Sequence, residues 1–325
     1  MTDVVDQALA LWGFDGATCR LIAERENRVF RVDHHGKAYA LRLHRAGYRT
    51  DAELWSELQW VAELGRGGLN VPAPVPSAAG KVLHIVEGIQ IDVLTWLSGA
   101  PVGETGKPLQ TNDRIGLFHK IGQEMARMHM ISDAWTLPEG FTRCQWDRAG
   151  LVGDAPVWGR FWENPTLSDD QRSMFQSLRD SLQSDLSRLE GKSDYGLIHA
   201  DLVRENVLAD GGELQLIDFD DAGFGFRLFD LATTLLKNRS EPDYQALKQA
   251  LVTGYLSIRE IDLAALDLFL LARAVTYVGW IIPRMDEAGS EARNARFIDI
   301  ATDLAHEYLA RMGSPRDGRN GDAAS

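Results

Sequence analysis

The apolar positions in the first hundred residues predict a small antiparallel sheet with one main helix. Residues 28–33 and 38–44 are rich in apolar side chains and flank the polar turn His34-His35-Gly36-Lys37, a pattern typical of a hairpin. A second hairpin is predicted within residues 81–99. Between the two hairpins, residues 51–69 place apolar side chains at helical spacing and end with glycines, which predicts one helix with a glycine stop.

The segments around this sheet predict where one lobe ends and the next begins. Prolines 72, 74 and 76 forbid a helix and favour an extended connector, and residues 98–101 are typical of an exit linker. We therefore predict an N-terminal lobe over residues 1–97 and a C-terminal lobe over residues 98–315. The polar, glycine-rich residues 316–325 predict a disordered tail.

Periodic apolar positions farther along the chain predict a mostly helical second lobe. Residues 113–131 repeat apolar side chains at the spacing of a buried helix face. Two short strands are predicted at residues 206–210 and 213–220, with the turn Gly211-Gly212 between them. The fold class is thus α+β, with a small antiparallel-sheet lobe and a larger helical lobe. Further helical patterns cover residues 168–190, 241–257, 261–283 and 289–312.

Composition and charge narrow the surroundings in which the chain can work. The 325 residues include 34 Lys and Arg against 47 Asp and Glu, a net charge of −13, which disfavours nucleic acid and anionic membranes as partners. Cys19 and Cys144 lie far apart and match no metal spacing, which fits a reducing compartment.

The first residues lack the basic stretch of a signal peptide. Residues 263–282 contain Asp267 and Arg273, which predicts a buried helix and not a membrane span. Together these features predict a cytoplasmic protein.

Candidate chemistry is concentrated in residues 196–225, "GLIHADLVRENVLADGGELQLIDFDDAGFG". Polar side chains interrupt apolar strands there, near the strand ends, and in a compact lobe we expect them to converge on one cleft. These side chains are His199, Asp201, Asn206, Asp218 and Asp220.

Phosphoryl transfer requires such a set of groups. A carboxylate must orient and deprotonate the attacking hydroxyl, and oxygen ligands must hold Mg²⁺ against the phosphates of ATP. Asp201 suits the base, and Asn206 can offer its carbonyl oxygen to the metal. Asp218 is the charged metal ligand, expected on the strand that runs beside the loop.

The same motifs resemble the aminoglycoside phosphotransferase and choline kinase-like superfamily, whose members share the protein-kinase-like fold. Within it, the chain is similar to the branch with bacterial type II homoserine kinases and stress-response kinases. The resemblance covers roughly residues 20–285 and rests on several motifs in the expected order. The motifs include "ENRVFRV", "YALRLHR", "WSELQWVAEL", "VPAPVP", "GQEMARMH", "GLIHAD", "ENVL" and "IDFDDAGFG".

This resemblance implies roles at both ends of the nucleotide. At the catalytic end, Asp201 is the implied base, Asn206 and Asp218 bind Mg²⁺, and His199 supports the loop. At the nucleotide end, Arg42 stands at the strand-lysine position of kinases, and Glu57 on the next helix is its implied ion-pair partner. Thr95 and Leu97 belong to an implied hinge over residues 94–97 that meets adenine. Asn27 is implied to cap the loop at residues 24–28.

The chain departs from the family pattern at four places. The loop at residues 24–28, "ERENR", contains no glycine, so a phosphate cradle of glycine amides does not transfer to it. Ala200 and Val203 stand where relatives often carry Gly and His, and Glu205 stands where Asp is frequent. None of these changes removes the proposed base or a proposed metal ligand.

Simpler interpretations of the same residues remain open. His199 can be a satisfied core histidine, and Arg42 with Glu57 can be a surface ion pair of little energetic value. Asp220 and Asp221 can cap a turn or bind a second ion. Two larger sets are favoured as packing: Met125, Met128 and His129 on one helix, and the aromatic residues Trp55, Trp60, Tyr277 and Trp280, which alternatively form a box for a cationic substrate.

The sequence thus predicts an ATP- and Mg²⁺-dependent kinase acting on a small-molecule hydroxyl, in an amino alcohol, a hydroxy amino acid such as homoserine, or an aminoglycoside-like acceptor. Acceptor contacts are expected from the late helices and residues 143–162. A Ser/Thr protein kinase of the stress-response type and a catalytically silent nucleotide-binding regulator are the alternatives. Neither the acceptor nor the oligomeric state follows from the sequence.

Overall fold

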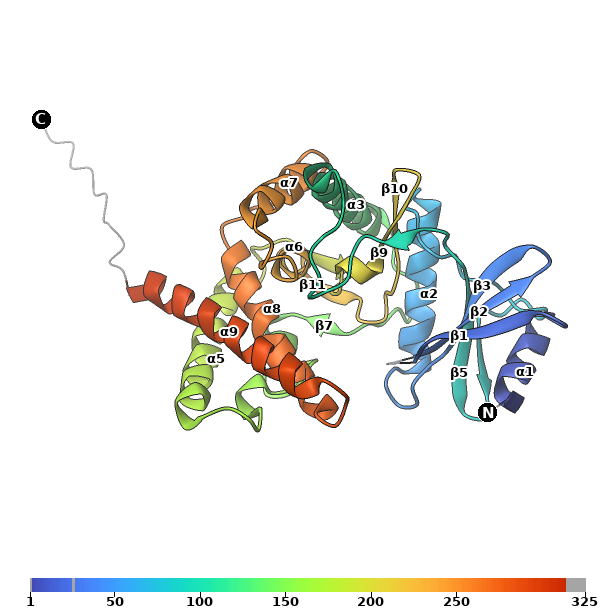
Figure 1. Ribbon diagram of the computed structural model, residues 1–325, viewed down its shortest axis with the longest axis horizontal. Helices are drawn as coiled ribbons and strands as arrows, with labels where there is room; N and C mark the ends of the chain where they lie inside the picture. Colours follow the sequence, from blue (N-terminus) through green and yellow to red (C-terminus); the bar gives the residue numbers. More distant parts are fainter. Residues whose placement is uncertain (1, 25–26, 314–325) are drawn as a thin grey trace, which may run out of the picture. The chain divides into compact units, whose positions relative to one another are not determined.

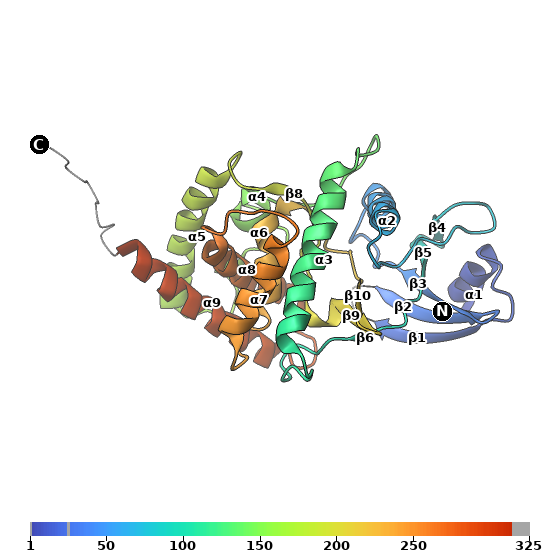
Figure 2. The same ribbon diagram turned by 90° about the horizontal axis from the view of Figure 1, so that it is seen from above.

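The computed structural model describes residues 2–24 and 27–313 of the chain (Figures 1 and 2). Contacts divide the chain into two compact units, of which unit 1 comprises Met1–Trp146 and Asp194–Ile261, and unit 2 comprises Asp147–Ser193 and Asp262–Ser325. Residues 25–26 of the glycine-free loop and the predicted tail lie outside the described residues. The lobe division at residue 97 stays a prediction.

Unit 1 contains a five-stranded antiparallel sheet in the order β1-β2-β3-β5-β4 (Figure 2). Both predicted hairpins are confirmed, because β2 pairs with β3 and β4 pairs with β5. The strands are Thr18–Glu24 (β1), Arg28–His34 (β2), Lys37–Leu43 (β3), Leu83–Val86 (β4) and Ile89–Thr95 (β5).

Strands β3 and β5, in the interior of this sheet, direct alternate side chains to opposite faces. One face is covered by α1 (Thr2–Leu11) and the other by α2 (Asp51–Arg66) (Figure 2). Leu41 and Val93 belong to the apolar cluster that α1 covers. Arg42, the next residue of β3, bonds instead to Glu57 of α2. Successive strand residues point to opposite faces, so the polar residues between these apolar positions face α2.

The predicted helix over residues 51–69 is confirmed as α2, and local hydrogen bonds fix its start. The Thr50 hydroxyl accepts a hydrogen bond from the Glu53 amide, and the Glu53 carboxylate accepts one from the Thr50 amide. This reciprocal pair satisfies amides that have no partner within the first turn. The helix ends at Arg66, followed by Gly67.

The rest of unit 1 is mostly helical, with two small three-stranded sheets, β10-β9-β6 and β7-β11-β8. Helices α3 and α7 pack along each other. The helices are α3 (Arg114–Ala134), α6 (Arg227–Leu236) and α7 (Tyr244–Leu256). The strands are Ala100–Pro101 (β6), Gln145–Trp146 (β7), Tyr195–Ile198 (β8), Val207–Asp210 (β9), Glu213–Leu216 (β10) and Gly223–Phe226 (β11).

Unit 2 is helical in the part that the structure describes, and α8 packs against α9. The apolar segment that contains Asp267 and Arg273 forms the buried helix α8, as predicted. Within residues 2–24 and 27–313, no helix is both long and apolar enough to cross a membrane. The main helices are α4 (Arg148–Val152), α5 (Asp169–Leu189), α8 (Leu266–Trp280) and α9 (Ser290–Gly313).

Two expectations about the elements were wrong. The first lobe has a fifth strand and a second helix, β1 and α1, beyond the four strands and one helix predicted. The predicted strand at residues 213–220 is also too long, because β10 ends at Leu216. Asp218 has a φ of 67°, a left-handed conformation that a strand cannot contain. Asp218 therefore lies on the loop after β10 and not on the strand.

Candidate active site

The loop between β8 and β9 brings Asp201 and Asn206 together. Asn206 ends a short 3-10 turn, Arg204–Asn206, directly before β9. Its Nδ2 donates to the Asp201 carbonyl oxygen at 2.9 Å and to the Asp201 carboxylate at 3.3 Å. These bonds occupy the amide nitrogen, so Oδ1 is the end of the Asn206 side chain that can accept a ligand.

His199 connects this loop to the loop that carries Asp218. Its Nε2 lies 3.0 Å from the Ile217 carbonyl oxygen, and its Nδ1 accepts a hydrogen bond from the Asp201 amide at 3.3 Å. A ring nitrogen that faces a carbonyl must carry a proton, so Nε2 donates to Ile217 and Nδ1 is the acceptor. The side chain is fully buried against Phe219. His199 thus links the residue next to Asp218 with Asp201 itself.

Asp230 of α6 anchors the loop between β8 and β9, a role that was not predicted from the sequence. Its carboxylate accepts hydrogen bonds from the amides of His199 at 2.9 Å and Ala200 at 2.6 Å, and it lies 3.0 Å from Nε2 of His129. Ala200 has a φ of 64°, a conformation that glycine adopts without strain. The glycine that the family resemblance implies at this position would adopt this backbone geometry more readily than alanine does.

Asp218 lies within electrostatic reach of Asp201. Burial raises the pKa of Asp218 to about 8, and the nearby carboxylates of Asp220, Asp201 and Asp221 add to the rise, while Arg42 opposes it. Crowded carboxylates with raised pKa values are a pattern typical of functional sites. The structure therefore groups Asp201, Asn206 and Asp218, the three residues on which the predicted chemistry depends.

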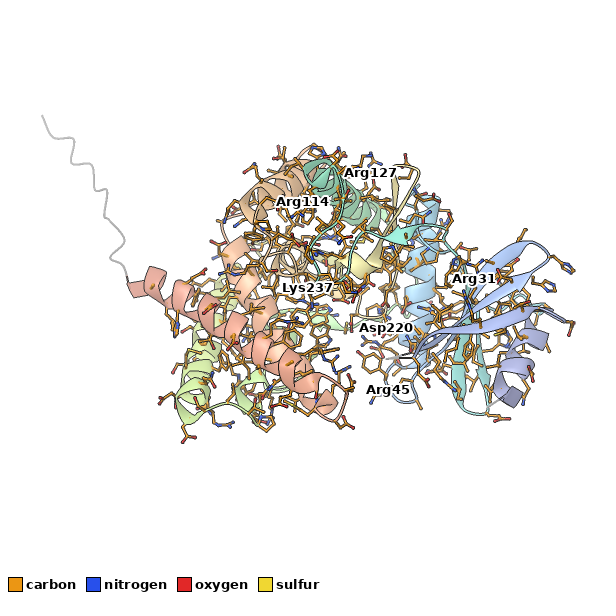
Figure 3. All side chains as sticks on the ribbon, in the orientation of Figure 1. Arg31, Arg45, Arg114, Arg127, Asp220 and Lys237 are labelled. Atoms are coloured by element: carbon orange, nitrogen blue, oxygen red, sulfur yellow. The ribbon has the colours of Figure 1, made fainter. Side chains whose placement is uncertain are left out.

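Asp220 lies two residues farther along this loop, next to α2 (Figure 3). Burial raises the pKa of Asp220 to about 6, with further increases from Glu57 and Asp221. Its Oδ1 is buried and meets no hydrogen-bond donor within the part of the chain that the structure describes. A buried carboxylate oxygen of this kind is costly unless a proton or a cation satisfies it.

Arg42 and Glu57 form a buried ion pair at 2.8 Å, with only 8% and 2% of their side chains exposed. The interpretation as a surface pair is therefore wrong. Burial alone would lower the pKa of Arg42, but the carboxylates of Asp92 and Glu57 raise it well above its usual value. Arg42 stays charged and lies close enough to Asp218 to lower its pKa.

Arg143 joins the Asp218 loop to α2, and sequence analysis missed this role. Its guanidinium donates to the carbonyl oxygens of Phe219 at 2.9 Å, Asp220 at 2.6 Å and Ala222 at 2.7 Å. Its Nη1 lies 3.4 Å from Glu57 Oε2. Because Oε1 of Glu57 binds Arg42, one carboxylate holds both arginines and links the two halves of the site.

The remaining predicted nucleotide residues lie on the sheet and its connections. The amides of Thr95 and Trp96 already donate to the carbonyl oxygens of Ala73 and Ala38, which leaves the Leu97 amide as the hinge candidate. Asn27 accepts a hydrogen bond from the Arg45 amide at 3.4 Å. These hydrogen bonds do not show whether Asn27, Thr95 or Leu97 binds a nucleotide, so their assignment as nucleotide-binding residues stays a prediction.

Several side chains for which packing was favoured over a ligand role are buried or already paired within the chain. Met125 and Met128 are fully buried in α3, as expected. Trp60 is also fully buried, and its indole donates to Ser132 Oγ at 2.9 Å. In unit 2, the guanidinium of Arg273 lies 4.4 Å from the Tyr277 ring centroid, so a cation of the chain itself already faces that ring.

Residues 143–162, from which acceptor contacts are expected, include side chains that support the fold, and their acceptor role stays a prediction. Besides Arg143, Trp146 is fully buried and donates to the Asp221 carbonyl oxygen at 2.8 Å. Asp147 accepts a hydrogen bond from the Gly150 amide at the start of α4.

The buried side chain of His129 should make the folded protein less stable in acid. Burial lowers the pKa of His129 to about 4, and the charge of Arg227 adds to this effect. The unfolded chain binds a proton near pH 6.5, whereas folded His129 resists it until about pH 4, so folding stability falls as the pH drops between these values. We expect the free energy of unfolding, measured with urea, to fall more steeply between pH 6.5 and 4.5 in the wild type than in His129→Gln. Equal slopes would contradict this assignment.

The residues at the site fit a divalent cation shared with phosphate oxygens. Mg²⁺ in nucleotide enzymes is commonly held by one or two carboxylates together with phosphates and water. Asp218 and the Oδ1 atoms of Asn206 and Asp220 offer the oxygen atoms that this cation prefers. Within the described ranges, no three His, Cys, Asp or Glu side chains form a metal cage by themselves.

Comparison with known proteins gives the class of this site. A model of the phosphotransferase enzyme family matches residues 18–269. This match spans well over half of the chain, so the protein belongs to the phosphotransferase enzyme family. The expected family is thereby confirmed.

Individual relatives narrow the class to kinases. Amicoumacin kinase of Bacillus subtilis (strain 168) is 28% identical over 235 residues, 71% of this chain and 66% of that relative. Homoserine kinase of Sinorhizobium medicae (strain WSM419) is 31% identical over 257 residues, 76% of this chain and 72% of that relative. The solved structure of a microcompartment-associated aminopropanol kinase has 28% identity and a TM-score of 0.83, covering 96% of this chain and 99% of that one. The predicted protein-kinase-like α+β fold is confirmed, and the chain is a phosphotransferase of the kinase type.

Proposed function

We propose that the protein is an ATP- and Mg²⁺-dependent kinase that phosphorylates a hydroxyl group of a small molecule. The observation that carries this proposal is the grouping of Asp201, Asn206 and Asp218: Asn206 bonds to Asp201, and the charge of Asp201 acts on Asp218. A base and oxygen ligands for a cation are the groups that phosphoryl transfer needs side by side.

At the catalytic end, Asp201 accepts the proton of the acceptor hydroxyl as that oxygen attacks the γ-phosphorus atom; the bond from this phosphorus to the β–γ bridging oxygen breaks, and ADP leaves. Asn206 Oδ1 and Asp218 hold the cation, which when bound neutralises charge on the phosphates. His199 holds the Asp201 amide, and Asp230 holds the amides before it, so the base is presented by a fixed backbone. Asp220 serves as a second cation ligand or as a turn residue.

At the nucleotide end, Arg42 binds the α- and β-phosphates. A guanidinium has five N–H donors, and its contacts with Glu57 and Asp92 occupy three of them within the described chain. Two N–H groups are left for phosphate oxygens. The backbone of Thr95 and Leu97 meets adenine, and Asn27 stabilises the glycine-free loop.

The connection after the Asp218 loop favours a small acceptor over a protein substrate. Strand β11 ends at Phe226 and α6 begins at Arg227, so no long activation segment intervenes. Homoserine and aminopropanol, after which two of the similar proteins are named, each combine a hydroxyl with an amine. We therefore place amino alcohols, hydroxy amino acids and aminoglycoside-like compounds first among candidate acceptors.

A coupled assay of ADP release tests this proposal. Purified protein with MgATP is offered aminopropanol, homoserine and a set of aminoglycosides, with a no-acceptor control that measures basal hydrolysis. We expect at least one acceptor to raise ADP release well above the control, with label from ATP recovered in the small molecule. Label recovered only in protein after incubation with cell extract would instead support a protein kinase. A protein that neither binds MgATP nor turns it over would overturn the proposal.

A further inference from the structure

A buried aspartate lies directly opposite Arg42 in the sheet. Arg42 on β3 and Asp92 on β5 are partners in the antiparallel register. Both point to the face that α2 covers, because their neighbours Leu41 and Val93 belong to the cluster under α1. The Asp92 side chain is fully buried. An ionised carboxylate in the middle of an apolar strand is costly unless it has charged partners, so its contacts should indicate its role.

Asp92 holds the Arg42 guanidinium by two hydrogen bonds, whereas Glu57 holds it by one. Nε and Nη2 of Arg42 donate to the two oxygens of Asp92, each at 2.8 Å. Nη1 donates to Oε1 of Glu57, also at 2.8 Å. A single hydrogen bond fixes the distance of a planar group but allows it to rotate, whereas a two-bond fork fixes its plane as well. The orientation of the guanidinium is therefore set by Asp92.

Asp92 is itself held in place by a third donor. Nε2 of His44 lies 2.8 Å from Oδ2 of Asp92, the same oxygen that binds Nη2 of Arg42. Burial would raise the pKa of Asp92, but Arg42 and His44 depress it well below its usual range. The carboxylate is therefore ionised at every pH at which the enzyme would work.

We propose that Asp92 is a positioning residue for nucleotide binding: it fixes the plane of the Arg42 guanidinium so that the two remaining N–H groups face the phosphates. The inference rests on the proposed kinase function. It also gives a reason for the extra carboxylate beside arginine. A lysine ammonium presents three donors around a point charge and has no plane to fix, so a chain with lysine at residue 42 would need only Glu57.

The test measures nucleotide affinity and kinetics in four proteins: wild type, Asp92→Asn, Arg42→Lys and the double variant. Positioning of non-reacting phosphates contributes to binding in the ground state and the transition state alike. We therefore expect Asp92→Asn to raise KM for ATP and Kd for an ATP analogue about tenfold, with kcat changed less than about threefold. In the Arg42→Lys background, the same Asp92→Asn substitution should change KM less than about twofold.

A matched control separates this effect from the loss of an ion pair in general. Arg31 and Asp33 on β2 form the same kind of fork, with Nε and Nη2 of the arginine on one carboxylate, at an exposed position. Asp33→Asn should leave KM and kcat unchanged. If Asp92→Asn does not fold, Asp92→Glu keeps the charge but moves the fork by one methylene, and it should show the same rise in KM.

The outcomes distinguish the inference from the function on which it rests. If the wild type binds MgATP but Asp92→Asn lowers kcat and leaves KM unchanged, Asp92 only maintains the folded fraction and the inference is wrong. An equal change in KM in both backgrounds overturns it too, because Asp92 then acts independently of the guanidinium. If the wild type itself neither binds MgATP nor releases ADP, the proposed function fails, and the inference fails with it.

Discussion

Asp201→Asn should lower kcat by about 1000-fold while Kd for an ATP analogue stays within about twofold of the wild type. The amide that replaces the carboxylate cannot accept the proton of the acceptor hydroxyl. It can still accept the hydrogen bond that Asn206 donates to the carboxylate, so the loop should keep its conformation. The measurement is ADP release under saturating acceptor together with calorimetric titration of the nucleotide.

An exposed carboxylate provides the control for this experiment. Asp210, at the end of β9, lies on the same hairpin and bonds to Ser98. Asp210→Asn should retain wild-type kcat. Turnover of Asp201→Asn within about tenfold of the wild type would remove Asp201 as the base, since general base catalysis typically contributes at least about 100-fold.

The grouping of the candidate catalytic residues could be predicted from the sequence because its signals are local. Asp201 and Asn206 lie five residues apart, and Asp218 follows one short hairpin later. A hairpin of such short strands keeps its two ends close together whatever the rest of the fold does. The grouping of these three residues therefore depended little on long-range packing.

The supporting residues could not be predicted, because their partners lie far away in the chain. Asp92 is 50 residues from Arg42, and Arg143 is 79 residues from Ala222. The opposition of Arg42 and Asp92 depends on the register between β3 and β5, which are not consecutive strands. One local signal was available: "IQIDVL" places a charge within an apolar strand, and such a charge requires a buried partner.

The missed strand β1 illustrates a different limit. Nearly all its side chains are exposed, since it lies at the edge of the five-stranded sheet. An edge strand without a buried face shows no alternation of apolar and polar residues, and that alternation is the signal on which strand prediction depends. Asp218 was placed on a strand for the opposite reason: the apolar run Leu216-Ile217 continues past the end of β10.

Asp218→Asn should combine a large loss of activity with a gain of stability. We expect kcat to fall by about 100-fold or more, because a lost charged ligand removes several kcal/mol of stabilisation from the transition state. The concentration of Mg²⁺ needed for half-maximal activity should rise as well. Both quantities are measured by titrating Mg²⁺ in the ADP-release assay, with Asp210→Asn again as the control.

The stability gain follows from the raised pKa of Asp218. Without a cation, the folded protein keeps a proton on this carboxyl up to about pH 8, whereas the unfolded chain releases it near its usual pKa of 3.8. The unfolded state thus binds fewer protons between these values, and the stability contribution of Asp218 falls as the pH rises. Asparagine carries no titrating proton, so the variant should exceed the wild type in free energy of unfolding by more at pH 8 than at pH 5, measured with urea in the presence of EDTA.

Added Mg²⁺ should raise the free energy of unfolding of the wild type more than that of the variant. The Asp218 carboxylate, which destabilises the fold without a cation, is the group that binds the cation when Mg²⁺ is added. A variant that is no more stable at pH 8 would contradict the raised pKa of Asp218, and one that responds to Mg²⁺ as the wild type does would show that Asp218 is not the ligand.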